Sequence, residues 1–174
     1  MLVWEVEVLD LLAIQQDVER VSHGQDPAGK FGAGATEAEL VKCESALGMR
    51  LEERHRRFLT FANGWEGFSG GIDLFASSDF LGSERFRETQ QFIHQIDDVI
   101  LGSHARQRKL LVPIARSWVS TNMLVMKRGG GSFMPEVLWF ENEPMDEFAT
   151  FDDMFVTFKE YARGSLEFWR SQPK

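Results

Sequence analysis

Apolar side chains recur every three or four positions in five stretches of the chain, which predicts amphipathic helices there. The stretches are residues 6–22, 36–47, 52–62, 83–100 and 150–162. Short apolar runs with turn residues between them predict strands instead, at residues 72–75, 110–115, 123–126 and 137–140.

Several helix ends are marked by the residues that stand there. Thr36 and Glu39 form a capping box, in which each side chain can bond the backbone amide of the other. Gly48 stands where a helix commonly ends in a left-handed residue. Asn63-Gly64 marks another end, and Thr150 precedes two acids that suit a first turn.

The order of these elements predicts the fold class. Helices are grouped, and the later strands follow one another through short turns, such as the one at Gly129–Gly131. We expect an α+β fold in a single domain, with a largely antiparallel sheet packed against several helices. Residues 65–71 are rich in glycine and are expected to form a loop.

Length and glycine content suggest how the chain is divided. Its 174 residues are enough for one ordinary domain. Glycine and proline are frequent from residue 24 to residue 34. We therefore expect residues 1–31 to form an N-terminal helical arm with a Gly/Pro-containing loop, and residues 32–174 to form the α+β domain.

Charge excludes some classes of partner. The formal net charge is -8, which disfavours binding to nucleic acid phosphates or an anionic membrane.

The single cysteine, Cys43, allows no internal disulfide and no thiolate-rich zinc site. No apolar stretch approaches the roughly 20 residues that span a bilayer, and the N-terminus lacks the pattern of a signal peptide. We expect a soluble, cytoplasmic protein.

The segment from Gly34 to Trp65 resembles the opening of the SUKH superfamily, which includes yeast cell-wall-synthesis regulators and many bacterial toxin-immunity proteins. The matching positions are Glu44, Leu47, Gly48, Leu51, Phe58, Leu59, Asn63 and Gly64, followed later by Val112–Ala115 and Thr150–Phe155. Glu52 and His55 stand where a proline and a tyrosine are usual. The resemblance covers roughly residues 32–162.

The resemblance implies an α+β fold and a role in binding other proteins. Bacterial members commonly neutralise a cognate toxin, so it implies an immunity protein that binds a toxin domain stoichiometrically. A regulatory or scaffold module of the same superfamily, without a toxin partner, is the alternative. The oligomeric state stays open.

The residues themselves assemble no catalytic or metal site. Gly67–Gly71 matches G-x-S-x-G, but a helix precedes it and a strand follows, which reverses the context of a nucleophile elbow. The four histidines form no metal-binding motif, and His55 is expected to replace an aromatic residue between helices. Cys43 on an apolar helix face is expected to be a buried hydrophobe. We expect no cofactor and no metal; a small hydrolase is a third hypothesis.

Charges are segregated in the second half of the chain. Residues 99–135 contain no acid, and their cations are Arg106, Arg108, Lys109, Arg116, Lys127 and Arg128. Residues 136–153 contain no base, and their acids are Glu136, Glu141, Glu143, Asp146, Glu147, Asp152 and Asp153. Either the two runs balance each other on adjacent strands, or the acids form a patch that attracts a basic partner.

Large aromatics near turns are the other lead, because such residues often anchor interfaces. They are also able to plug the ends of the core instead. The predicted partner-binding residues are Trp65, Glu66, Phe68, Trp118, Glu141, Glu143, Asp146 and Glu147. Glu141, Glu143, Asp146 and Glu147 are expected in a loop, free to face a partner.

Overall fold

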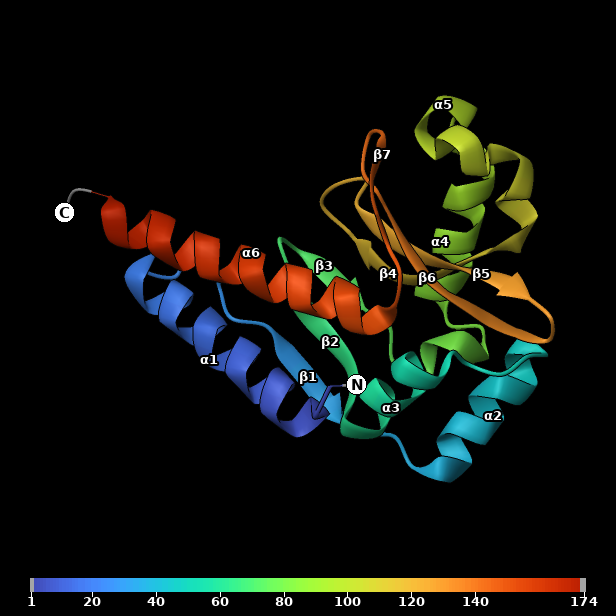
Figure 1. Ribbon diagram of the computed structural model, residues 1–174, viewed down its shortest axis with the longest axis horizontal. Coiled ribbons are helices and arrows are strands. Elements are labelled where there is room, and N and C mark those ends of the chain that lie inside the picture. The colour runs from blue at the N-terminus through green and yellow to red at the C-terminus, as the bar shows by residue number, and fades with distance from the viewer. Residues whose placement is uncertain (1, 173–174) are drawn as a thin grey trace.

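The computed structural model describes residues 2–172 and contains helices, two 3-10 helices and one sheet (Figure 1). The elements are α1 (Trp4–Val21), β1 (Lys30–Ala33), α2 (Glu37–Leu47), α3 (Glu53–Phe61), β2 (Ala62–Ser69), β3 (Ile72–Leu74), η1 (Asp79–Leu81), α4 (Glu84–Gln95), α5 (Asp98–Leu101), η2 (Gly102–Leu110), β4 (Leu111–Ser117), β5 (Met123–Gly129), β6 (Ser132–Phe140), β7 (Pro144–Phe148) and α6 (Phe151–Ser171).

The seven strands lie side by side in chain order, and every neighbouring pair is antiparallel. The predicted α+β class with an antiparallel sheet is confirmed. Because each strand reverses the direction of the one before it, alternate connections lie at the same end of the sheet. The turns after β2, β4 and β6 therefore lie at one end, and the turn after β5 lies at the other.

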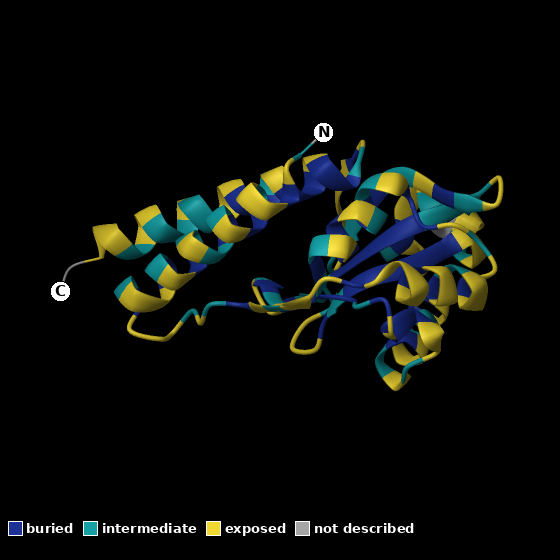
Figure 2. Cartoon of the chain, turned by 90° about the horizontal axis from the view of Figure 1, so that it is seen from below, coloured by how far each residue is buried: buried dark blue, intermediate teal, exposed yellow. Residues whose placement is uncertain are grey.

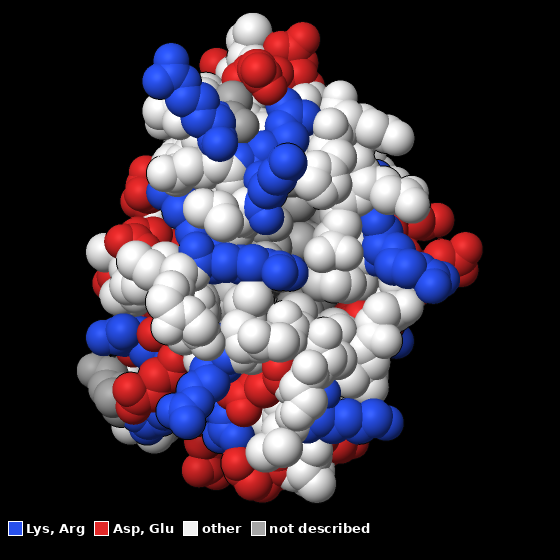
Figure 3. Space-filling view, turned by 90° about the vertical axis from the view of Figure 1, so that its right-hand side faces the viewer, with Lys and Arg blue, Asp and Glu red and all other residues white. Residues whose placement is uncertain are grey.

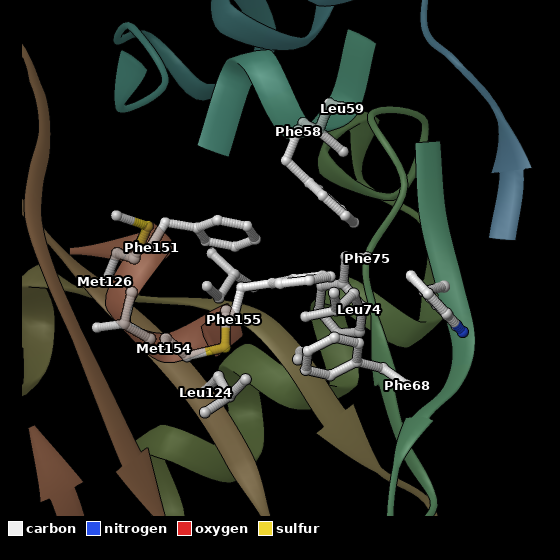
Figure 4. Close-up of a cluster of buried hydrophobic side chains, with 14 of the residues drawn as sticks. Phe58, Leu59, Phe68, Leu74, Phe75, Leu124, Met126, Phe151, Met154 and Phe155 are labelled. Atoms are coloured by element: carbon white, nitrogen blue, oxygen red, sulfur yellow. The ribbon is translucent and has the colours of Figure 1, made fainter. Parts of the chain in front are cut away.

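Two apolar cores lie on opposite faces of the sheet, as the alternation along β5 shows. Met123 and Val125 belong to a small core beneath α4, α5 and η2, whereas Leu124 and Met126 belong to the main core beneath the other helices. Successive strand side chains point to opposite faces, so one strand serves both cores. Figure 4 shows the main core, where Phe58, Phe151 and Phe155 face the strands.

Helix α1 packs along α6, and the two helices run in the same direction. The ring of Trp4 lies 5.3 Å from that of Phe58 and 5.0 Å from that of Phe155, so α1 contributes to the main core. The far halves of both helices extend beyond the sheet (Figure 2). The expected boundary between residues 31 and 32 falls within β1.

Helix capping follows the sequence closely. Thr36 and Glu39 form both bonds of the capping box, and Gly48 ends α2 with φ +67°. Thr150 caps α6 by accepting from the Asp153 amide. Glu52, at the position where a proline is usual, caps α3 by accepting from two backbone amides.

Two predicted loops are strands in the structure. Residues 65–69 belong to β2, where Gly64 (φ +83°) and Gly67 (φ +64°) accompany an irregular register against β3. Residues 144–148 form β7, an edge strand whose side chains are exposed except for Phe148. The glycines mark irregularities within a strand, and the acids suit an edge strand, which charged side chains protect from unwanted pairing.

The predicted helix over residues 83–100 is two helices. Helix α4 ends at Gln95, and Ile96 adopts an extended conformation. Asp97 then caps the short α5 by accepting from the Val99 amide at 2.8 Å. Asp97 therefore divides the stretch into two helices by capping the second, although the apolar spacing continues across it.

Candidate protein-interaction surface

Three turns meet at one end of the sheet, which we call the turn end: residues 70–71, 118–122 and 141–143. The side-chain amide of Asn122 donates to the Glu141 carboxylate at 3.0 Å, and the Thr121 hydroxyl donates to the side-chain oxygen of Asn142 at 3.1 Å. A Cβ at Gly71 would lie 3.2 Å from Val119, which is 87% exposed. The antiparallel order thus joins the turn carrying Trp118 to the turn carrying Glu141.

Trp118 is fixed in place although 42% of its surface is exposed. Its indole Nε1 donates to Asp73 Oδ2 at 3.1 Å. Asp73 is held in turn, because its other oxygen accepts from the Gly67 amide at 2.7 Å and it forms an ion pair with Arg85 at 3.3 Å. A bond from each of three segments therefore converges on one carboxylate.

Two arginines also lie close to the Trp118 ring. The guanidinium carbons of Arg85 and Arg116 lie 5.7 Å and 4.8 Å from its centre. Arg116 lies 4.7 Å from the Phe92 ring as well, and burial lowers the pKa of its guanidinium. Cation–π contacts of this kind favour one orientation of the indole. We call Asp73, Arg85, Arg116 and Trp118 the Trp118 cluster.

A shallow hollow of about 650 Å³ lies beside the Trp118 cluster. It lies against the start of α4, where Ser83, Glu84 and Glu88 line it together with Trp118. A partner side chain could enter this hollow and pack against the indole.

The acidic residues of the predicted set extend from the turn end along β7. Glu143, Asp146 and Glu147 are exposed, whereas Glu141 is partly buried. Asn122 connects these residues to the sheet, because it also accepts from the Trp139 indole at 2.8 Å. Glu147 lies 3.6 Å from His104. The acids are thus presented on a turn and an edge strand.

The two charge runs do not neutralise each other in the described part of the chain. Across residues 2–172, no Lys or Arg of residues 99–135 forms an ion pair with an acid of residues 136–153. The contact between His104 and Glu147 joins the runs, but burial and nearby Lys127 lower the pKa of that imidazole and so oppose its positive charge. The alternative in which the two runs pair directly on adjacent strands is therefore not realised by ion pairs of Lys or Arg in this range.

Three predicted residues lie away from this surface. Trp65 and Phe68 are each 1% exposed and belong to the main core, so a partner cannot reach them in this fold. Their burial matches the alternative in which such aromatics plug the core. Glu66 is exposed on β2 and lines a separate hollow with Lys30 and Phe31.

Sequence reasoning missed Asp73 and Arg85, which hold Trp118. They come from β3 and α4, far from residue 118 in the chain, and only the fold brings them together. Asp73 did carry a signal, since it is the polar residue between two apolar ones of a predicted strand. The sequence offered nothing that paired it with Trp118.

The residues considered for chemistry have structural roles. Cys43 is buried, and burial raises the pKa of its thiol to about 12. Ser69 ends β2 and is followed by a turn into β3, not by a helix. In residues 2–172, no three His, Cys, Asp or Glu side chains gather as metal ligands would. Nor does any helix in that range have the length and apolar character to cross a bilayer.

The model of the SMI1 / KNR4 family (SUKH-1) matches residues 34–162. This range runs from the residue after β1 to the middle of α6 and includes the whole turn end. Helix α1 lies outside it. No curated protein matches the chain.

Proposed function

Because the chain belongs to the SMI1 / KNR4 family (SUKH-1), we propose that it is a bacterial immunity protein that neutralises a toxin domain by binding it stoichiometrically at the turn end. Family membership supports a protein-interaction or immunity-type role. The toxin partner and the docking surface are our additions.

The observation that carries this proposal is the rigid, half-exposed Trp118. Tryptophan and arginine dominate the residues whose truncation weakens protein interfaces most. A side chain that is already held in one orientation loses little conformational entropy when a partner covers it. The bond to Asp73 and the stacking of Arg85 and Arg116 supply that preorganisation before any partner arrives.

The acids of the turn end and of β7 define the charge of the partner. Glu141, Glu143, Asp146 and Glu147 have no Lys or Arg ion-pair partner within residues 2–172. Opposite charges on a partner would speed its approach, whereas the buried centre of the interface would slow its release. The proposed partner therefore presents a basic surface with a recess for the indole.

Blocking a toxin in this way needs no bond to be made or broken by the chain itself. One molecule bound over the toxin's active surface is sufficient, so the protein would act at a ratio of one to one. This distinguishes the proposal from a hydrolase, which would act at substoichiometric amounts.

The test uses the purified protein and a candidate toxin domain encoded beside its gene. Wild type should bind at one to one and rescue cells that express the toxin. Trp118→Ala should weaken binding by roughly 30-fold, about 2 kcal/mol. Trp169→Ala, on the far half of α6, should change it less than about twofold.

Other results would count against parts of the proposal. Equal losses in the two tryptophan variants would remove the turn end as the docking surface. Continued cell death, with no binding, would reject that toxin as the partner. A stable complex with a protein that is not toxic would favour the scaffold alternative.

A further inference from the structure

The basic run of residues 99–135 is divided by the fold. Arg108 pairs with Asp98, and Arg116 belongs to the Trp118 cluster. The remaining cations are Arg106 and Lys109 on η2 and Lys127 and Arg128 on β5. These four residues lie toward the end of the sheet opposite Trp118.

A fifth cation joins them from a distant part of the sequence. Arg50 follows α2, and its amide donates to the Gly131 carbonyl at 3.1 Å in the turn after β5. Its own carbonyl accepts from the Phe133 amide at 3.0 Å. Arg128 stands opposite Phe133 of the main core in the register, and Lys127 stands opposite Leu111 of the small core, just after η2. Their side chains therefore leave opposite faces of the sheet at this end. We call Arg50, Arg106, Lys109, Lys127 and Arg128 the basic end.

The cations of the basic end have no acidic partner in the fold. Within residues 2–172, none of the five forms an ion pair with a carboxylate, unlike Arg54, Arg56 and Arg85. Elsewhere in this range, Lys30, Lys42, Arg57 and Arg87 also form none. Figure 3 views this side of the molecule: Lys and Arg side chains lie across its upper part and middle, whereas acidic and basic side chains are mixed in its lower part. Glu136 on β6 is the acid of the neighbouring strand.

Repulsion among unpaired cations costs free energy, and surface pairs are easily formed where acids are near. An acidic partner would relieve this repulsion. We infer that the basic end is a second docking surface, which binds an acidic segment of a protein.

The charge around the basic end favours a protein segment over nucleic acid. The chain is acidic overall, and Glu136 lies on β6, the strand next to the one that carries Lys127 and Arg128. A polynucleotide carries phosphates along its whole length, so it would also meet those acids. A short acidic segment can place its charges on the five cations alone.

The inference is tested with two labelled probes: a peptide of alternating glutamate and glycine, and oligothymidylate of the same formal charge. Binding to the full chain is measured by fluorescence anisotropy at low and high salt. The test variant combines Arg106→Gln, Lys109→Gln and Lys127→Gln. The matched control removes the same charge elsewhere, with Lys30→Gln, Lys42→Gln and Arg57→Gln.

We expect the peptide to bind wild type at low salt and to dissociate at high salt. The test variant should lose roughly tenfold in affinity, and the control less than about twofold. If the triple variant does not fold, Arg106→Gln with Lys109→Gln alone carries the test, since both side chains are exposed. Trp118→Ala should bind the peptide as wild type does, which separates this surface from the turn end.

The inference is overturned by any of three results. The first is that the peptide does not bind wild type at low salt. The second is that the control variant loses as much affinity as the test variant. The third is that oligothymidylate binds more tightly than the peptide.

Discussion

The imidazole ring of His55 is stacked on the phenyl ring of Phe151, with 4.8 Å between their centres and 23° between their planes. This contact joins α3 to α6 in the main core, where His55 fills a position at which the family usually has tyrosine. The sequence predicted that His55 replaces an aromatic residue between helices, and the stack confirms it. Burial without a hydrogen-bond partner for Nδ1 favours the neutral ring.

This burial predicts how stability depends on pH. It lowers the pKa of His55 to about 3, whereas the unfolded chain keeps a pKa of about 6.5. Between these values the unfolded state binds the extra proton. The contribution to stability is therefore complete above about pH 6.5 and falls as the pH drops toward 3.

Lowering the pH from 7 to about 5 should cost roughly 2 kcal/mol through His55 alone. Urea unfolding of wild type and His55→Phe at both pH values measures this cost as the difference between their pH effects. His94→Gln, on an exposed position, should behave as wild type. The same pH effect in His55→Phe and wild type would contradict the prediction.

Replacing Asp73 should make the Trp118 indole more mobile without removing it. Asp73→Asn removes the charge that holds both the indole and Arg85, so the indole should become more mobile. In proton–nitrogen NMR spectra, the Trp118 indole resonance should shift and exchange faster with solvent. Partner binding should weaken by a few-fold, because the anchor remains but is less ordered. Glu84→Gln, which lines the same hollow, is the control.

An unchanged indole resonance in Asp73→Asn would mean that the two stacked arginines suffice to fix the ring. If Glu84→Gln also weakened partner binding, the cause would be the lost negative charge of the hollow and not the mobility of the indole.

Cys43 should be unreactive in the folded protein. It is fully buried on α2, and burial raises the pKa of its thiol to about 12, so almost no thiolate is present near neutral pH. A thiol reagent such as DTNB should label it only as the protein unfolds in denaturant. Labelling at the rate of free cysteine without denaturant would contradict its burial.

The sequence predicted the features that depend on neighbouring residues. The capping box at Thr36 and Glu39, the left-handed Gly48 and the cap at Thr150 are each settled within one helical turn. Apolar spacing likewise located α2, α3 and α6. These features are local, so the sequence around them contains their physical cause.

What the sequence missed depends on contacts between distant segments. The strand β7 has acidic side chains typical of a loop, and only its pairing with β6 makes it a strand. The same is true of the Trp118 cluster, whose members come from β3, α4, β4 and the turn after β4. Of the predicted site, the turn that carries Trp118 is bonded to the turn that carries Glu141. Trp65 and Phe68 are buried in the main core instead.

Lys159 and Arg163 both join α6 to α1 through ion pairs, but we expect them to contribute differently to the free energy of unfolding. Lys159 is only 8% exposed and pairs with Glu7 and, at 3.1 Å, with Asp10 of α1. Lys159→Ala removes both bonds and the packing of the buried lysine stem, and should destabilise the protein by about 2 kcal/mol. Arg163→Ala removes a more exposed pair with Asp10 and should cost less than about 1 kcal/mol. Equal costs in urea unfolding would contradict this assignment.

Helix α1 provides the test of whether residues 1–31 are an arm or part of the core. Leu11 is fully buried in the main core, whereas Leu9 on the same helix is exposed. Gln15 adds a bond from its side chain to the Phe68 carbonyl of β2 at 2.7 Å. If α1 folds with the domain, Leu11→Ala should lower the free energy of unfolding by about 3 kcal/mol, in one transition. Leu9→Ala should change it by less than about 0.5 kcal/mol. Two results would mean that the helix is an arm which docks on an independently stable domain. One is an unchanged free energy of unfolding in Leu11→Ala; the other is a separate early unfolding transition, the only one that Leu11→Ala shifts.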